Sequence, residues 1–138
     1  MLSMMSCKNE KKQDVYNPFA TPEGCVKEFL DAKSEKNIGR MLNCYSYEAK
    51  YERILREGLQ DLIDKEDGKV RGYSRTKNYH INSIKLKEEY PNSAVVRVDY
   101  TATYSDNNVY SDSYDMNLVK DSGNWKLEAE FTYTISSY

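Results

Sequence analysis

Residues 94–104 (AVVRVDYTATY) and 109–120 (VYSDSYDMNLVK) decide the fold of this chain. In both segments apolar or aromatic residues alternate with polar ones, which is the period of a β-strand that buries one face. Residues 105–108 (SDNN) between them are rich in side chains that favour tight turns. A further alternating segment, residues 125–135, follows a second turn at residues 121–124 (DSGN). The pattern therefore predicts three consecutive strands in a curved antiparallel meander.

Three amphipathic helices are predicted in the first half of the chain. Pro22 follows Thr21, a pair typical of a first helical residue and its N-cap, so a helix is expected from Pro22 until it fades near residues 34–37. Two further helices are expected at residues 38–45 and from residue 46 or 47 to about 64. Each has an apolar face, which must be buried against another element.

A fourth strand is expected between the helices and the meander. Residues 79–87 have the strand period, and residues 90–93 (YPNS) form the turn that follows. The last helix contains Gly58, which is expected at a close packing point. The sequence therefore predicts an α+β fold, with N-terminal helices packed on a strongly curved, four-stranded antiparallel sheet of cone-like shape.

Size and composition fit one domain and argue against nucleic acid as a partner. The chain has 138 residues, of which 13 are tyrosine, and a net charge of −2. It has no basic patch interleaved with aromatic residues, which phosphate contacts would require. No apolar run is long enough to predict a membrane-spanning helix. The tyrosines favour a sheet with one wet or ligand-facing side, although strand propensity alone also explains them.

The three cysteines do not have the spacing of a metal site. Cys7, Cys25 and Cys44 are 18 and 19 residues apart, and the chain has one histidine, His80. We therefore expect neither a metal nor a cofactor. Cys25 and Cys44 are expected on neighbouring helices, where they form either a disulfide, if the protein is exported, or two buried free thiols.

The first 18 residues differ in composition from the rest of the chain. Residues 1–6 are apolar or small up to Cys7, and residues 8–14 are highly polar. This switch resembles the end of a bacterial lipoprotein signal, although the basic start and most of the apolar region are missing. Residues 1–18 are therefore expected to be a truncated signal end and a flexible polar tether, and residues 19–138 the folded domain. A lipid on Cys7 would anchor the domain to the cell envelope and make its only membrane contact; without such a signal it would be cytoplasmic.

Two short motifs resemble one known superfamily. The first is Thr21-Pro22-Glu23 followed by the apolar row Val26, Phe29 and Leu30, and the second is the ending Gly123-Asn124-Trp125-Lys126-Leu127. Over residues 20–135 this order resembles the nuclear transport factor 2-like (cystatin-like cone) superfamily, and within it the uncharacterised bacterial lipoprotein families. The resemblance implies a cone-shaped domain. It supports the fold better than any activity, because both motifs are structural.

The resemblance also implies where chemistry would lie, because enzymes of this superfamily work inside the cone, often with an aspartate or a His–Asp pair plus tyrosine. Asp112 is the charged interruption of the predicted inner face, between Tyr110 and Tyr114 and beside Tyr100 and Tyr104 of the neighbouring strand. These five residues are the predicted ligand-binding set. Tyrosine hydroxyls would donate hydrogen bonds to a ligand, and Asp112 could act as a base. The alternative is that Asp112, close to a hairpin turn, reaches water, and no residue is assigned as catalytic.

Three functions remain compatible with the sequence. The first is a non-catalytic exported or surface-tethered lipoprotein domain that binds a small molecule, a peptide or a protein in or around its cone. The second is a small enzyme of the isomerase, cyclase or dehydratase type with Asp112 as base. The third is a structural domain with a filled cone that forms a homodimer. A cavity of about 300 Å³ or more would separate the first two from the third.

Overall fold

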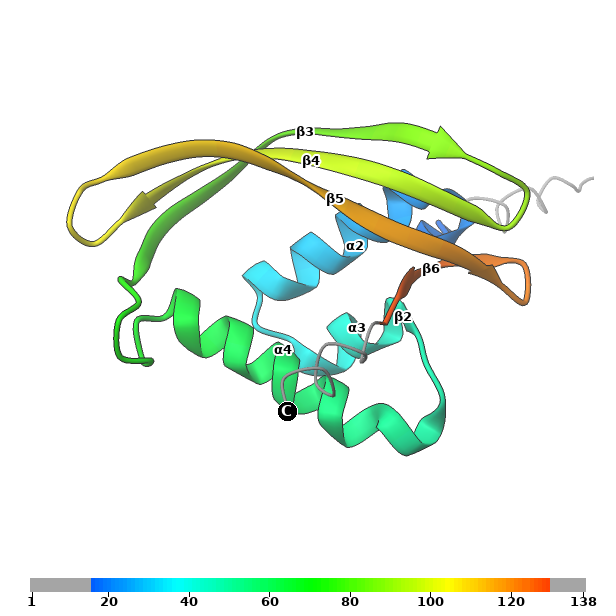
Figure 1. Cartoon of the computed structure of the whole chain (residues 1–138), viewed down its shortest axis with the longest axis horizontal. Helices are drawn as coiled ribbons and strands as arrows, with labels where there is room; N and C mark the ends of the chain where they lie inside the picture. The colour runs from blue at the N-terminus through cyan, green and yellow to red at the C-terminus, as the bar shows by residue number, and fades with distance from the viewer. Residues whose placement is uncertain (1–15, 130–138) are drawn as a thin grey trace, which may run out of the picture.

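The structure is a computed structural model, and it describes residues 16–129. A curved sheet arches over a layer of helices (Figure 1). Helix α2 packs directly on strands β3, β4 and β6, and α4 packs on α3 further from the sheet. The elements in chain order are η2 (Pro18–Ala20), α2 (Pro22–Ser34), α3 (Ile38–Asn43), β2 (Tyr45–Ser46), η3 (Ala49–Tyr51), α4 (Glu52–Glu66), β3 (Thr76–Glu89), β4 (Ser93–Tyr104), β5 (Val109–Asp121) and β6 (Asn124–Glu128).

The described residues form a five-stranded mixed sheet in the order β2-β6-β5-β4-β3. Strands β3 to β6 make the predicted antiparallel meander, in which Tyr100 lies opposite Asp112. The short strand β2 adds a parallel edge beside β6, with Tyr45 opposite Leu127. The α+β class is confirmed. The prediction of a four-stranded, wholly antiparallel sheet was wrong, because a strand of two residues has no period to read.

The boundaries of the long strands agree with the sequence periods. Strands β4 and β5 begin and end within one residue of the predicted segments. Strand β3 is longer than predicted and has three register shifts against β4. Such bulges bend a strand and increase its twist, so they help the sheet to curve over the helices. Residues 130–135, the remainder of the predicted last strand, lie outside the described residues.

The helices start at the capping residues of the sequence. Thr21 Oγ1 accepts a hydrogen bond from the backbone N–H of Gly24 at 3.0 Å, at the start of α2 as predicted. Asn37 Oδ1 accepts from the backbone N–H of Arg40 at 3.1 Å, at the start of α3. These bonds satisfy donors that a helix cannot pair internally. Helix α3 ends two residues earlier than predicted, and α4 begins five or six residues later, after η3.

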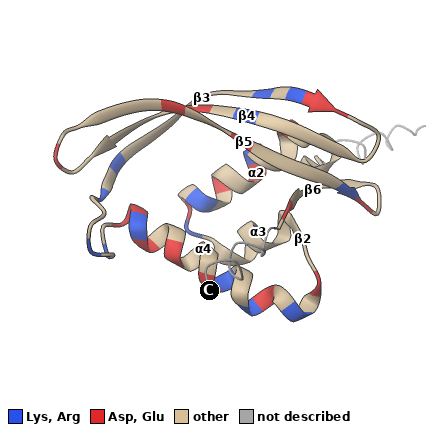
Figure 2. Cartoon of the chain, in the orientation of Figure 1, with Lys and Arg blue, Asp and Glu red and all other residues tan. Residues whose placement is uncertain are grey.

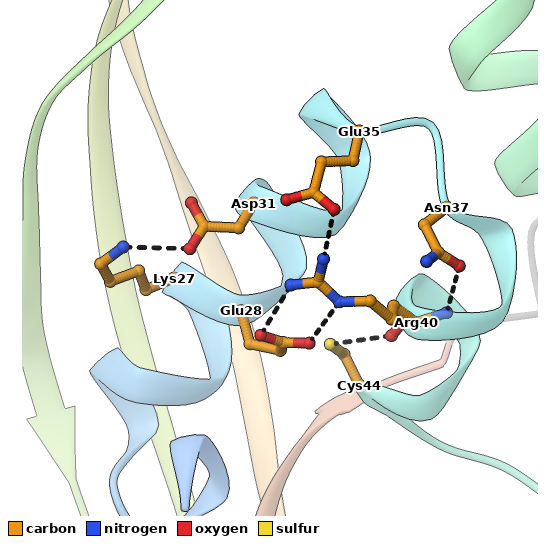
Figure 3. Close-up of polar contacts among 7 residues, drawn as sticks. All are labelled: Lys27, Glu28, Asp31, Glu35, Asn37, Arg40 and Cys44. Carbon is orange, nitrogen blue, oxygen red and sulfur yellow. Dashed lines mark hydrogen bonds and ion pairs between the residues drawn. The ribbon is translucent and has the colours of Figure 1, made fainter. Parts of the chain in front are cut away.

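Arg40 joins α3 to α2. Its guanidinium group donates to both carboxylate oxygens of Glu28, at 2.9 and 3.0 Å, and to Glu35 Oε1 at 2.6 Å (Figure 3). A bidentate arginine–carboxylate pair is both stronger and more specific in geometry than a single hydrogen bond. The thiol of Cys44 donates to the carbonyl oxygen of Arg40 at 3.3 Å in the same view. These contacts hold the short helix α3 against α2.

The core lies between α2 and the inner face of the sheet. In β4 the residues predicted to point inward are buried, since Ala94, Val96, Val98 and Ala102 are at most 2% exposed. Trp125, at the start of β6, is 3% exposed. The alternation in the sequence thus identified the buried face of the central strand. Tyr100 and Tyr104 continue this alternation, so they lie on the same face of β4.

Gly58 does not occupy a close packing point, so that prediction was wrong. A Cβ added at Gly58 would meet no atom within 4 Å. The tight glycine is Gly24 in α2, where an added Cβ would lie 2.3 Å from the carbonyl oxygen of Pro18. Glycine is needed at Gly24 because the preceding turn η2 folds back on the first turn of the helix.

Candidate functional site: a tyrosine-lined pocket

A cavity of about 420 Å³ lies between the inner face of the sheet and helices α2 and α4. We call it the tyrosine pocket, because six tyrosines line it. They come from β2, the loop before β3, and strands β3, β4 and β5. Apolar side chains and two hydroxyl residues, Ser74 and Thr76, complete the walls, with charged side chains at the helix ends. The lining residues are Phe29, Lys33, Tyr45, Leu62, Lys65, Glu66, Tyr73, Ser74, Thr76, Tyr79, Tyr100, Tyr104, Tyr114 and Met116.

Three tyrosines from adjacent strands form the sheet wall of the pocket. The rings of Tyr79 and Tyr100 stack with centroids 5.0 Å apart, and Tyr100 and Tyr114 lie 5.7 Å apart. The hydroxyl oxygens of Tyr79 and Tyr114 are 3.3 Å apart and share a hydrogen bond. Burial raises the pKa of all three phenols above the ordinary value. The hydroxyls therefore stay protonated at neutral pH and can donate hydrogen bonds.

A charged pair from the two helices faces these tyrosines. Lys33 of α2 is 8% exposed, and its Nζ lies 2.8 Å from Glu66 Oε2 at the end of α4. The same ammonium group lies 4.2 Å from the ring centroid of Tyr79, a cation–π distance. Within residues 16–129, Lys33 is the only charged side chain that is buried. The pair thus places one cation and one anion at the edge of a mainly aromatic and apolar cavity. A second cation that lines it, Lys65, is paired with Asp61 at 3.0 Å.

Sequence reasoning missed Lys33 and Glu66, although the helical periods contained a signal. Lys33 follows Val26 and Phe29 at helical spacing, so it falls on the apolar face of α2. Glu66 likewise follows Leu59 by seven residues on the buried stripe of α4. A charged residue on an apolar helix face needs a partner when it is buried. That rule would have identified both residues as unusual, but it could not have predicted that they form an ion pair with each other.

The structure brings three of the five predicted ligand-binding residues to the pocket. Tyr100, Tyr104 and Tyr114 line it. Tyr110 does not: it is 56% exposed, and its ring packs edge-on against Tyr104, with ring centroids 5.6 Å apart. Asp112 is exposed and is not a lining residue either.

Asp112 is exposed because of its place along the sheet. It shares the inner face with Tyr100 in register, as predicted. However, the β4–β5 hairpin extends past the ends of the helices, so no helix covers its inner face near the turn (Figure 1). The carboxylate of Asp112 accepts a hydrogen bond from the backbone N–H of Ser113 at 2.8 Å. The alternative weighed from the sequence, a carboxylate that reaches water near a hairpin turn, describes its position.

Cys25, Cys44 and His80 lie outside the pocket. Cys25 and Cys44 are free thiols, each with 0% exposed area, and the thiol of Cys25 donates to the Cys44 carbonyl oxygen at 3.6 Å. The disulfide named as one alternative is therefore not formed in this structure. His80 is exposed on β3.

Within residues 16–129, no three metal-ligating side chains lie close enough together to hold an ion. None of the helices in this range has the length and hydropathy of a membrane-spanning segment. Cys7, the predicted lipidation site, lies outside the described residues.

Comparison with solved structures identifies the architecture. A protein described as a candidate NTF2-like transpeptidase from Campylobacter jejuni matches with a TM-score of 0.50 and 11% identity, over 80% of this chain and 99% of that one. The chain has the nuclear transport factor 2-like fold. The predicted resemblance is confirmed at this level. No family model matches the sequence, and the search of curated proteins found no match.

Two further solved structures were found to be similar to this chain. A SEC-C motif containing protein from Rhodopseudomonas palustris matches with a TM-score of 0.54 and 13% identity, over 80% of this chain and 77% of that one. An NTF-2 like protein of unknown function from Shewanella oneidensis matches with a TM-score of 0.48 and 12% identity, over 75% and 88% of the two chains. At these identities the likeness concerns the fold alone.

Proposed function

We propose that this protein is a non-catalytic binding domain that takes up a small aromatic or apolar molecule in the tyrosine pocket. The volume of about 420 Å³ carries the proposal. It lies within the range of about 300–1,000 Å³ that is usual for small-molecule sites. Stacked tyrosines offer flat apolar surfaces to a ring, and their neutral hydroxyls can donate to a ligand oxygen. A filled cone, as in the purely structural alternative, would leave no cavity of this size.

The composition of the pocket favours binding over catalysis. Its lining contains neither cysteine nor histidine. The carboxylate that does line it, Glu66, is held by Lys33 at 2.8 Å. Asp112, the base of the enzymatic alternative, is exposed outside the lining. A general base must come within hydrogen-bond reach of the proton that it removes. These features support binding rather than catalysis as the function of the pocket.

The proposal includes export and a lipid anchor on Cys7. It is supported by the composition switch at residues 1–14, where an apolar and small stretch before Cys7 gives way to a polar segment. The test is metabolic labelling with a palmitate analogue in the native bacterium, with Cys7→Ser as the control. Incorporation of label that Cys7→Ser abolishes is expected, and equal labelling of the two proteins, or none, would rule the anchor out.

Binding can be tested with a neutral fluorescent probe, N-phenylnaphthylamine, titrated into the purified domain. We expect saturable binding of one probe per chain, since the pocket can enclose an aromatic ring system. Tyr100→Ala should weaken binding about tenfold, because it removes the central ring of the stacked wall. Tyr100→Phe keeps the ring and should bind nearly as well as the unmodified protein.

The matched control is Tyr90→Ala. Tyr90 is 58% exposed in the turn between β3 and β4 and does not line the pocket. The Tyr90→Ala variant should bind the probe with unchanged affinity. Near-ultraviolet circular dichroism of each variant verifies that the fold is intact. Absence of saturable binding by the unmodified protein, or equal losses for Tyr90→Ala and Tyr100→Ala, would refute the proposed site.

A further inference from the structure

A second concave surface adjoins the tyrosine pocket. It has a volume of about 520 Å³ and lies where the ends of α2 and α4 meet the start of β3. Figure 2 shows basic and acidic residues gathered at this end of the molecule, where α4 leads into β3. We call it the basic groove, because five basic and two acidic side chains line it. Its charged lining residues are Lys33, Lys36, Lys69, Arg75, Lys77, Glu66 and Asp67.

The groove and the pocket share a wall. Lys33, Glu66, Thr76 and Tyr79 line both of them. A molecule that lies against the tyrosines can therefore extend past the Lys33–Glu66 pair into the groove without crossing a backbone segment. The two cavities thus form one continuous site. Its aromatic end suits the apolar part of such a molecule, and its cationic end suits the polar part.

The cationic end has a surplus of positive charge. Both acidic groups are already paired, since Glu66 binds Lys33 and the Asp67 carboxylate lies 2.8 Å from Lys36 Nζ. Among residues 16–129, neither Lys69 nor Arg75 has an ion-pair partner.

The backbone around Arg75 is fixed rather than loose. Its carbonyl oxygen accepts a hydrogen bond from the backbone N–H of Ser105 at 2.8 Å, which ties it to the turn between β4 and β5. On its other side Gly68 has a φ of +73°, and an added Cβ there would lie 2.9 Å from the Cβ of Arg75. A guanidinium group on a fixed backbone is suited to planar, bidentate recognition of an oxyanion.

From this geometry we infer that the ligand is an organic anion, with an aromatic or apolar body in the tyrosine pocket and a carboxylate or similar oxyanion in the basic groove. The inference rests on the proposed function and names the ligand class for the same site. Arg75 and Lys69 bind the oxyanion. The tyrosines bind the body, and Lys33 remains paired with Glu66 at the junction.

The test uses two probes that share one skeleton. N-phenylnaphthylamine is neutral, and anilinonaphthalene sulfonate carries an added sulfonate, which stands in for the oxyanion. The unmodified protein should bind the sulfonate about fivefold to tenfold more tightly, the preference expected from partly exposed charge pairs. At about 1 M salt, where the screening length is about 3 Å, this preference should largely disappear.

Two double variants with equal loss of charge identify the groove. Lys69→Gln with Arg75→Gln should abolish the preference for the sulfonate and leave the affinity for the neutral probe unchanged. Arg53→Gln with Lys85→Gln removes two exposed charges outside both cavities and should keep the preference. Thermal melting checks that all proteins remain folded.

The outcomes distinguish the two proposals. Equal affinity for both probes in the unmodified protein, or a preference that survives Lys69→Gln with Arg75→Gln, would overturn the anion inference and leave the pocket in place. A preference lost equally in the control variant would also overturn it, because net charge would then be the cause. Failure of both probes to bind would overturn the proposed function itself.

Discussion

At the scale of single residues, Lys33 is the unusual feature of the domain. A lysine that is 8% exposed has lost most of its hydration, and it is stabilised by Glu66 at 2.8 Å and by the face of Tyr79. Burying a charge is costly unless it is paired, so each partner holds the other in place. The pair therefore shapes the junction of pocket and groove while adding little net stability.

Lys33→Met should lower the free energy of unfolding by about 1–3 kcal/mol, because it leaves Glu66 without its partner at a half-buried site. Lys33→Met combined with Glu66→Leu should recover much of this loss, since neither charge then needs a partner. The measurement is urea unfolding followed by circular dichroism.

A second lysine of the same helix is the control for Lys33. Lys27 forms an i,i+4 pair with Asp31 at 3.0 Å, but both side chains are at least half exposed (Figure 3). Lys27→Met should change the free energy of unfolding by less than about 0.5 kcal/mol. A loss equal to that of Lys33→Met would show that burial of the Lys33–Glu66 pair has no special cost.

At the scale of the elements, two helical glycines are expected to respond in opposite ways to the same change. Gly58→Ala should stabilise the protein by about 0.5–1 kcal/mol, because α4 gains helix propensity and the added methyl meets no atom within 4 Å. Gly24→Ala should destabilise it by about 1–3 kcal/mol, because the methyl would lie 2.3 Å from the Pro18 carbonyl oxygen. Chemical denaturation of both variants measures the two signs, and two changes of equal sign would contradict the tight junction of η2 with α2.

At the scale of the whole molecule, the tyrosine wall makes stability depend on alkaline pH. Burial raises the folded-state pKa of Tyr79, Tyr100 and Tyr114 above the ordinary value near 10. Below that pH these phenols are protonated in both the folded and the unfolded chain, so their contribution to the free energy of unfolding is fully present. Above it the unfolded chain releases protons that the folded chain retains, and stability falls as the pH rises.

A spectroscopic titration of tyrosinate absorbance should therefore have two phases. The phenols of Tyr79, Tyr100 and Tyr114 should ionise in the later phase, above the ordinary pKa or together with unfolding, because burial raises their pKa. Tyr114→Phe should reduce this later phase. A single phase in a protein that is still folded would contradict the burial of the wall.

Much of the fold could be predicted from local patterns. The alternation of Val96, Val98 and Tyr100 identified the inner face of β4, and the turn after it fixed the hairpin. The Thr21 cap located the start of α2. These features are local, because a strand period, a cap and a turn depend on neighbours a few residues away.

The site was predicted only in part, because it depends on distant contacts. Alternation placed Asp112 on the inner face correctly, but it could not show that the helices end before they cover that level of the sheet. The pairing of Lys33 with Glu66 joins residues 33 apart on two helices. Strand β2, with two residues, pairs with β6 next to a backbone hydrogen bond of 2.7 Å from the N–H of Leu127 to the carbonyl oxygen of Cys44, a contact between residues distant in the sequence.

Local periodicity and turn chemistry were enough to predict the three α-helices, the long strands and the apolar face of each, but not the two-residue strand β2 or the start of α4. The tertiary structure alone decided where the cone is open and which charges meet there. That depends on how far each helix reaches beneath the sheet. Packing of the whole chain thus leaves Tyr100, Tyr104 and Tyr114 around a cavity, exposes Asp112, and places Lys33 at the boundary between an aromatic pocket and a basic groove.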